Sequence, residues 1–519
     1  MERYFNTEGC CRPQEHYMVN LESRLAEIKK MVDAGKYFTI NRGRQYGKTT
    51  TLEALQEYLK DDYIVISMDF QWVSISEFET EENFVKAFSR ELWRQCKNII
   101  PSDLMEQVKA MRMSKEYMQA DLFLVLSEWC DISEKPIVLI IDEVDQASNN
   151  QVFLDFLAQL RGYYLKRNRY ATFQSVILAG VHDIRNLRQK IRPDVEHKHN
   201  SPWNIAANFD VEMSFSVEDI VGMLKEYEAD KQTGMDISAI ANLIYDYTSG
   251  YPVLVSHICK LNDEKLDASI RWTREGVVQA VGQIVKMKHP LFESLINKLE
   301  DDENLKNCVH AILIHGDKFS FNPDDASMEL AAMYGFIKSV DDGVQIANRI
   351  FEIRLYNAYL MSKEMQANKL YKAGTYDKSQ FISGGILDME KILERFVIHF
   401  NDIFGDKPEH FKEEQGREHF LLYLRPIING TGNFYIEPQT RDHKRMDVVV
   451  DYLGLQYIIE LKIWHGEEYN LKGENQLCGY LDRHHLNKGY LLSFCFNQKK
   501  EFGVHTVQVD GKIIVEAIV

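Results

Sequence analysis

The stretch of residues 41–50, NRGRQYGKTT, constrains the fold of this 519-residue chain more than any other feature. It joins a short apolar run at residues 37–40 to a helical pattern that begins near Lys48. A strand, a loop and a helix in this order form a phosphate-binding loop, in which backbone N–H groups converge on a phosphate. A lysine neutralises the phosphate oxygens, and a hydroxyl group binds Mg²⁺. We expect Gly47, Lys48 and Thr49 to take these roles.

The first half of this stretch, which we call the phosphate loop, departs from the strict pattern. That pattern has a glycine five residues before Gly47, where this chain has Arg42 beside Gly43. The alternative is a turn ahead of a helix whose lysine is merely solvated. Because the chemical end of the motif is intact, we predict that the loop binds ATP. The residues assigned to this role are Arg42, Gly43, Gln45, Tyr46, Gly47, Lys48, Thr49 and Thr50.

Residues 136–143, PIVLIIDE, form an apolar run that ends in two carboxylates. This pattern is typical of a central parallel strand whose C-terminal end faces a nucleotide. We expect Asp142 to join Thr49 in the Mg²⁺ shell and Glu143 to polarise the attacking water. The alternative is an acidic pair that only caps the strand.

Apolar runs at residues 63–69, 174–180 and 211–215 predict further strands, separated by helical patterns. Strands that alternate with helices predict an α/β fold with a parallel sheet covered on both faces. His182 follows one of these strands and could sense the γ-phosphate, although it and Asp183 could equally be turn and N-cap residues. A basic cluster at residues 185–192 could supply an arginine finger, contact nucleic acid or form a solvated face.

Composition and length narrow the classes of protein that fit. The chain is 45% hydrophobic and 27% charged, as in ordinary globular proteins, and its length suits about three domains. It has no apolar stretch of the ~20 residues that span a bilayer and no signal peptide, so we expect a cytoplasmic protein with no membrane partner. The net charge of −17 argues against indiscriminate coating of nucleic acid but allows a nuclease.

Several of these motifs together resemble the AAA-like ATPases of the STAND and archaeal-ATPase/origin-recognition type. The resemblance implies an ATPase core at residues 1–200, a helical lid at residues 201–287, ATP and Mg²⁺ as cofactors, and a homo-oligomer. It also implies that Pro252 of the lid contacts the nucleotide. The motifs that carry it are Phe5-Asn6-Thr7, His16-Tyr17-Met18-Val19, Gly47-Lys48-Thr49, Asp142-Glu143, Ser201-Pro202-Trp203-Asn204 and Gly250-Tyr251-Pro252.

Residues 288–362 predict a small winged-helix-like domain. Helical patterns at residues 291–298, 305–315 and 326–334 precede two strands, at 336–340 and 344–347, which meet at an Asp-Gly turn. Such modules often bind DNA. The candidate recognition helix, residues 324–330, is acidic, which favours a packing or protein-contact role. Residues 363–385 are polar and rich in Lys and Gly, and we expect a linker there.

A second group of chemical side chains lies in residues 386–519. A strand that begins at Asp447 is followed by a returning strand that carries Glu460, Leu461 and Lys462. The period of 2 along a strand puts Glu460 and Lys462 on one face. We expect the Asp447 and Glu460 carboxylates and the Leu461 carbonyl to hold Mg²⁺, and Lys462 to orient the attacking water.

This arrangement resembles the PD-(D/E)XK nuclease fold. The resemblance assigns Glu418, on a preceding helix, to the metal shell. It assigns Gln476 and Tyr480, one turn apart on a following helix, to the catalytic site. The alternatives are a charged surface hairpin and a domain that kept the fold but lost its activity.

Taken together, the motifs predict an ATP-binding and ATP-hydrolysing protein that controls a Mg²⁺-dependent nuclease. Its expected partner is nucleic acid, with DNA favoured over RNA, and the resemblance implies defence against foreign DNA. Two alternatives remain. One is a STAND-like signalling or scaffold ATPase with an inactive nuclease-fold domain. The other is a DNA repair or junction-resolving nuclease.

Overall fold

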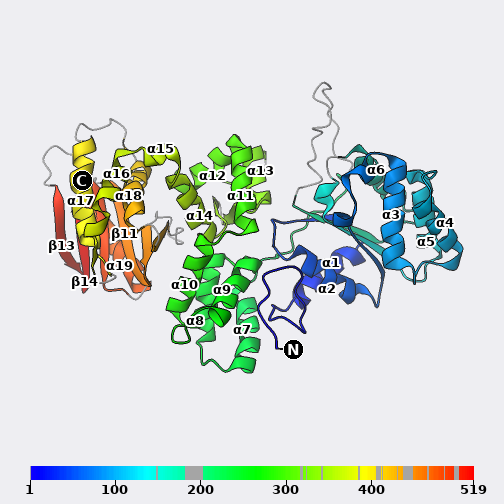
Figure 1. Cartoon of the computed structure of the whole chain (residues 1–519), viewed down its shortest axis with the longest axis horizontal. Coiled ribbons are helices and arrows are strands. Elements are labelled where there is room, and N and C mark those ends of the chain that lie inside the picture. Colours follow the sequence, from blue (N-terminus) through cyan, green and yellow to red (C-terminus); the bar gives the residue numbers. More distant parts are fainter. Residues whose placement is uncertain are drawn as a thin grey trace, which may run out of the picture. The chain divides into compact units, whose positions relative to one another are not determined.

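The computed structural model divides the chain into two compact units (Figure 1). The first consists of Met1–Gln232, Gly250–Ser256 and Met333–Gly335, and the second of Thr233–Ser249, His257–Ala332 and Phe336–Val519. The structure describes residues 2–147, 150–181, 203–315, 320–322, 324–340, 343–383, 386–404, 411, 413–428, 431–436, 448–463, 467–483, 486–495 and 502–519.

The first unit contains a four-stranded parallel sheet in the order β1-β4-β3-β2. Its strands are β1 (Phe38–Asn41), β2 (Ile64–Asp69), β3 (Ile137–Asp142) and β4 (Ser175–Gly180). Each predicted strand of this set is confirmed to within one residue at either end. The α/β class with a parallel sheet is therefore confirmed.

Helices cover both faces of this sheet. Ile137, Leu139 and Ile141 of β3 belong to a core shared with α3 to α6, which gather beside the sheet in Figure 1. Val138 and Ile140 point to the other face and are also fully buried. The helices of this unit are α1 (Glu22–Asp33), α2 (Lys48–Leu59), α3 (Glu81–Cys96), α4 (Ser102–Met113), α5 (Gln119–Ile132), α6 (Gln151–Leu165) and α7 (Val217–Lys231), with short 3₁₀ helices η1 (Phe70–Trp72), η2 (Ile75–Phe78) and η3 (Val144–Gln146).

The strand predicted at residues 211–215 is not formed, and this prediction was wrong. The chain instead pairs with β1 at a single parallel bridge between Phe38 and Ala207. The carbonyl groups that a strand would use bind arginines, because Arg42 donates to the Val211 oxygen and Arg24 to the Met213 oxygen. An alternating apolar pattern favours a strand but cannot foresee such side-chain competitors.

Most of the predicted lid and of the winged-helix-like domain lies in the second unit, whereas residues 201–232, 250–256 and 333–335 belong to the first. The predicted hairpin is present, with Ile337 opposite Ile346. The predicted helices are also present, so the sequence periodicity was sufficient for these elements. The elements are α8 (Ile237–Thr248), α9 (Pro252–Glu264), α10 (Arg274–Lys286), α11 (Pro290–Asp301), α12 (Glu303–His315), α13 (Ala326–Met333), β5 (Ile337–Val340), β6 (Gly343–Ile346) and α14 (Arg349–Leu360).

The segment expected to be a linker is largely ordered instead. It forms α15 (Lys363–Gln366), α16 (Lys369–Asp377), the 3₁₀ helix η5 (Lys378–Gln380) and the strand pair β7 (Ile382–Ser383) and β8 (Ile386–Leu387). Helix α16 packs on α18 (Glu413–Ile428) so closely that a Cβ atom on Gly374 would lie 2.1 Å from the Tyr423 carbonyl oxygen. The buried Asp377 carboxylate accepts hydrogen bonds from His399 and Tyr423. These residues therefore belong to the C-terminal fold.

A six-stranded mixed sheet, in the order β13-β14-β12-β11-β10-β9, forms the centre of that fold. The hairpin β10–β11 is antiparallel, and α19 then connects β11 to the parallel strand β12. This is the helix, hairpin, helix, strand order predicted from the sequence. The elements are α17 (Met389–Phe404), β9 (Gly432–Ile436), β10 (Val448–Tyr452), β11 (Leu455–Ile463), α19 (Glu467–Arg483), β12 (Lys488–Phe494), β13 (Gly503–Val509) and β14 (Lys512–Ile518).

Two further observations concern the whole chain. The eight cysteines are all free thiols, of which four are half-buried and four are buried. In the part of the chain that the structure describes, no helix is both long enough and apolar enough to cross a membrane.

Candidate functional site

The phosphate loop has the tight backbone that its sequence predicts. It leaves β1 at Asn41 and enters α2 at Lys48. Gly47, the N-cap of α2, has a φ of 80° and a ψ of 19°, and Gln45 also has a positive φ of 58°. The left-handed region is accessible to glycine at little cost, which explains Gly47 at the point where the loop turns into the helix.

Lys48 is buried inside this turn. Its ammonium donates hydrogen bonds to the carbonyl oxygens of Arg42 at 2.9 Å and Gly43 at 3.1 Å. Burial lowers the pKa of Lys48, and the nearby Glu143 carboxylate opposes that shift. A buried cation held by neutral carbonyl groups is not fully compensated, so an anion at this position is strongly favoured.

The two residues predicted to hold Mg²⁺ are joined directly. The Thr49 hydroxyl donates to one Asp142 oxygen at 2.8 Å, and the backbone N–H of Glu143 donates to the other at 2.8 Å. Strand β3 thus brings its terminal carboxylate to the first turn of α2. Carboxylate and hydroxyl oxygens are ligands that suit Mg²⁺, so the donor set fits that ion.

Glu143, the predicted water-polarising residue, directly follows β3 and has a φ of 54°. Burial raises the pKa of its carboxyl, and the neighbouring Asp142 raises it further. Two more carboxylates were missed by sequence reasoning. Asp69 lies opposite Asp142 at the end of β2, and Asp145 accepts a 2.6 Å hydrogen bond from Val181 after β4. The available signal was that Asp69 ends the neighbouring strand β2 and that Asp145 follows β3 by three residues.

Two side chains assigned to ATP binding contact the protein. The Arg42 guanidinium donates to the Val211 oxygen at 3.1 Å and lies over the Phe209 ring. The Tyr46 hydroxyl lies 2.7 Å from the Ser214 hydroxyl. Both side chains hold the phosphate loop against residues 209–214, while Gln45 is exposed. The loop backbone, more than these side chains, is available to a phosphate.

Of the remaining residues predicted for this site, Pro252 and Thr50 lie beside the phosphate loop or within it, and the others are not described by the structure. Tyr251 donates to the Arg44 carbonyl oxygen at 2.6 Å, and Pro252, the first residue of α9, is buried beside it. The Thr50 hydroxyl accepts a 3.1 Å hydrogen bond from the Cys11 backbone. His182, Asp183 and the basic cluster at residues 185–192 lie outside the residues that the structure describes.

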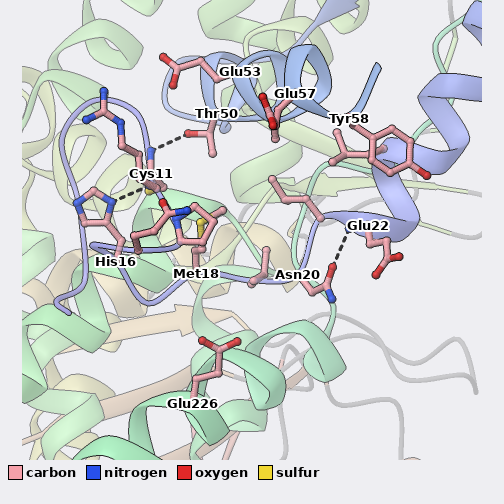
Figure 2. Close-up of a pocket in the computed structure, with 17 residues that line it drawn as sticks. Cys11, His16, Met18, Asn20, Glu22, Thr50, Glu53, Glu57, Tyr58 and Glu226 are labelled. Carbon is pink, nitrogen blue, oxygen red and sulfur yellow. Dashed lines mark hydrogen bonds between the residues drawn. The ribbon is translucent and has the colours of Figure 1, made fainter. Parts of the chain in front are cut away.

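A pocket of about 670 Å³ opens beside Thr50 (Figure 2). Residues 11–22, which we call the N-terminal segment, form one wall, α2 forms another, and Glu226 of α7 also lines the pocket. The motif at His16 pointed to this segment, but no sequence signal brought α7 to it. The labelled lining residues are Cys11, His16, Met18, Asn20, Glu22, Thr50, Glu53, Glu57, Tyr58 and Glu226.

The C-terminal candidate residues are partly brought together. On β11 the Glu460 carboxylate is fully buried, and the Lys462 ammonium lies 2.6 Å from it. Leu461 points to the opposite face of the sheet and is buried in the core. The predicted pair of Glu460 and Lys462 on one face is therefore present.

The other members of that predicted site lie on two helices and in the segment before β10. Glu418 of α18 accepts a 2.9 Å hydrogen bond from Tyr359, and Tyr480 is buried on α19, which also contains Gln476. Asp447 lies outside the described residues. Among the residues that are described, no three or more His, Cys, Asp or Glu side chains gather as metal ligands.

Sequence reasoning missed a buried carboxylate on the hairpin that carries Glu460. Asp451 of β10 accepts a 2.8 Å hydrogen bond from the Tyr247 hydroxyl of α8. Burial raises the pKa of Asp451, and its hydrogen bonds to Tyr247 and Gln456 partly offset this. An aspartate inside the apolar run VVVDY was the one available signal, and it did not reveal the partner.

The chain is similar in sequence to one protein family and in fold to several solved structures. The sequence profile of a family described as "AAA-like domain" matches residues 14–362. No curated protein matches the chain. Among solved structures, the Walker-type ATPase PABY2304 of Pyrococcus abyssi is 14% identical, with a TM-score of 0.45, over 68% of this chain and 99% of its own. The Aeropyrum pernix ORC1 protein in complex with DNA is 10% identical, with a TM-score of 0.31, over 66% and 95%. The Aeropyrum pernix ORC2 protein is 12% identical, with a TM-score of 0.35, over 66% and 94%.

Proposed function

Because this chain belongs to the family of AAA-like domain proteins, we propose that its phosphate loop binds and hydrolyses ATP and thereby controls a Mg²⁺-dependent nuclease at its C-terminal end. The observation that carries the first part is the 2.8 Å hydrogen bond between Thr49 and Asp142, next to the buried Lys48 ammonium. These three groups come from a loop and a strand about ninety residues apart in the sequence and meet at one point.

Each of these residues has a distinct role at the ATP site. Lys48 exchanges its loop carbonyl partners for phosphate oxygens, which make stronger, charge-assisted hydrogen bonds. Thr49 and Asp142 would hold Mg²⁺, and a bound Mg²⁺ would neutralise phosphate charge. Glu143 orients the attacking water, and its raised pKa makes its carboxylate a better proton acceptor.

The pocket in Figure 2 is a suitable place for the base and ribose of the nucleotide. It starts at Thr50, directly after the residue that holds Mg²⁺, and its volume of about 670 Å³ lies in the usual range for small-ligand sites. Apolar side chains such as Met18 and Leu25 line it together with polar groups at the rim. This composition favours a flat aromatic ligand with a polar edge.

For the C-terminal fold, we propose a PD-(D/E)XK-type nuclease that cleaves nucleic acid, with DNA favoured. The buried pair of Glu460 and Lys462 on β11 supports this assignment. Lys462 orients the attacking water and stabilises charge on the phosphodiester. Asp447, Glu460, Glu418 and the Leu461 carbonyl would hold Mg²⁺, and all four offer the oxygen ligands that this ion prefers.

A cleavage assay with matched variants tests both parts. Supercoiled plasmid, linear duplex and single-stranded DNA and RNA are incubated with Mg²⁺ and with no nucleotide, ATP or a non-hydrolysable analogue. Lys48→Ala should weaken ATP binding by roughly 100-fold, because it removes charge-assisted hydrogen bonds to phosphate. Lys462→Ala should abolish cleavage and leave ATP binding unchanged.

The controls are Lys60→Ala at the exposed end of α2 and Lys488→Ala on β12, which should behave as wild type. Loss of ATP binding in Lys462→Ala would contradict the separation of the two sites. Cleavage that persists in Lys462→Ala would overturn the nuclease assignment, and ATP binding that persists in Lys48→Ala would overturn the ATP site.

A further inference from the structure

Residues 247–251 carry the chain from the second unit into the first, and a tyrosine holds each end of this segment. At one end, the Tyr247 hydroxyl donates to Asp451 of β10 at 2.8 Å, inside the second unit. At the other end, the Tyr251 hydroxyl donates to the Arg44 carbonyl of the phosphate loop at 2.6 Å, inside the first unit. The segment therefore has a direct hydrogen bond to the phosphate loop at one end and to the hairpin β10–β11 at the other.

Both hydrogen bonds are shielded from water. Tyr247 is 1% exposed, Tyr251 is 3% exposed and Asp451 is 6% exposed. A hydrogen bond in such surroundings is stronger than one in water, and a buried group that loses its partner is costly. Neither tyrosine hydroxyl can leave its acceptor freely.

The residues between the two tyrosines are also held. The Ser249 hydroxyl accepts a 2.7 Å hydrogen bond from Lys338, and the Gly250 carbonyl accepts one of 2.8 Å from the Phe215 backbone. Gly250 has a φ of 73°, and a Cβ atom there would lie 1.9 Å from the Phe215 carbonyl oxygen. Consecutive Cα atoms are a fixed 3.8 Å apart, so this short segment has little slack to absorb a movement.

The anchor in the phosphate loop is sensitive to the nucleotide. Arg44 directly follows Arg42 and Gly43, whose carbonyl groups are the present partners of Lys48. A phosphate that takes over the Lys48 ammonium releases these two carbonyl groups. The backbone that carries the acceptor for Tyr251 then changes its hydrogen bonding.

The anchor in the second unit lies on the strand pair that carries the other candidate site. Asp451 of β10 is paired in register with Gln456 of β11, and β11 continues to Glu460 and Lys462. Arg274 of α10 also donates to Gln456, at 2.7 Å. A change at Tyr247 therefore acts on the strand pair that carries the candidate nuclease residues.

We propose that residues 247–251 transmit the state of the phosphate loop to the hairpin β10–β11, with Tyr247 as the positioning residue for that hairpin. This inference rests on the proposed ATP site. It adds the route by which nucleotide regulates the C-terminal site, and it does not require that site to cleave nucleic acid.

Hydrogen–deuterium exchange of the full chain, with and without Mg²⁺ and a non-hydrolysable ATP analogue, tests the proposal. In the wild type, the analogue should change exchange both in the phosphate loop and in residues 448–463. Tyr247→Phe should keep the change in the phosphate loop and lose the change in the hairpin. Tyr245→Phe, an exposed tyrosine on the same helix, should keep both changes.

Two more variants protect the test against a folding defect. Asp451→Asn retains an acceptor for the Tyr247 hydroxyl and should keep the hairpin change. Tyr251→Phe, measured at saturating analogue, should lose the exchange change in the hairpin, because it removes the hydrogen bond at the other end of the segment. Thermal unfolding of each variant checks that it is folded.

The possible outcomes separate the two proposals. A hairpin change that persists in Tyr247→Phe overturns the transmission route. A wild type that responds in the phosphate loop but not in the hairpin overturns it as well, while the ATP site stands. If the phosphate loop does not respond to the analogue, the ATP site fails and the route fails with it.

Discussion

The side chain of Arg42 attaches the phosphate loop to residues 209–211. It donates to the Val211 and Asn41 carbonyl oxygens and lies 5.5 Å from the centre of the Phe209 ring. Arg24, which is almost fully buried, holds the next part of the same segment through the Met213 carbonyl. At this scale, an arginine in the position of the usual glycine fastens the loop to its neighbours.

Arg42→Ala should therefore reduce stability more than nucleotide affinity. We expect the free energy of unfolding of the first unit to fall by about 1–2 kcal/mol, through the loss of hydrogen bonds and of the contact with the Phe209 ring. Chemical denaturation and calorimetric titration with ATP measure the two effects. Arg44→Ala is the control, because its side chain is exposed. Unchanged stability with abolished ATP binding would show that Arg42 binds the nucleotide directly.

At the scale of elements, a pair of histidines joins α9 to α11. The Nε2 atoms of His257 and His289 lie 3.1 Å apart, and the rings meet edge to face. His289 also caps α11, because its Nδ1 atom accepts from the Leu291 backbone. Burial, together with the nearby His289 and Lys260, lowers the pKa of His257 to about 4.

This pair should make stability fall in mild acid. Below pH 6.5, the unfolded chain takes up a proton that folded His257 does not bind until about pH 4, so unfolding becomes easier as the pH falls through this window. Between pH 7.5 and pH 5 the free energy of unfolding should fall by about 1–2 kcal/mol, a figure already reduced because His257 is partly exposed. Denaturation of the wild type and His257→Gln at both pH values measures it. An equal loss in both proteins would contradict the assignment.

At the scale of the whole molecule, the C-terminal fold starts earlier than its sequence suggested. Helix α16 supplies Asp377 to His399 and Tyr423, and its Gly374 lies against the backbone of α18. Leu370 of α16 is fully buried. These contacts make residues 363–383 an integral part of the second unit.

Limited proteolysis of the full chain tests this boundary. Trypsin should cleave slowly after Lys369, Lys372 and Lys378, because a packed helix is cut only when it opens. Gly374→Val should speed cleavage there by roughly 10–100-fold, since the larger side chain cannot fit against α18. Gly479→Ala in α19, where a Cβ atom meets open space, should leave the rate unchanged. Rapid cleavage in the wild type would restore the interpretation as a linker.

The sequence alone was sufficient for most of the elements, for the Gly47-Lys48-Thr49 end of the phosphate loop and for the pairing of Glu460 with Lys462. Strands β1 to β4 follow from short apolar runs, and the positions of Gly47, Lys48 and Thr49 follow from a motif whose chemistry is local. The period of 2 along β11 was enough to pair Glu460 with Lys462. Local geometry determines such features, so a single sequence can reveal them.

Only the tertiary structure decided which distant residues meet. It bound the carbonyl groups of residues 211–214 to Arg24 and Arg42 and prevented the strand predicted there. It also joined Tyr247 to Asp451, brought Glu226 to the pocket beside α2 and packed α16 on α18. Tyr247 and Asp451 are 204 residues apart along the chain. No local periodicity or propensity encodes a pairing over such a separation, because it depends on how completed elements pack.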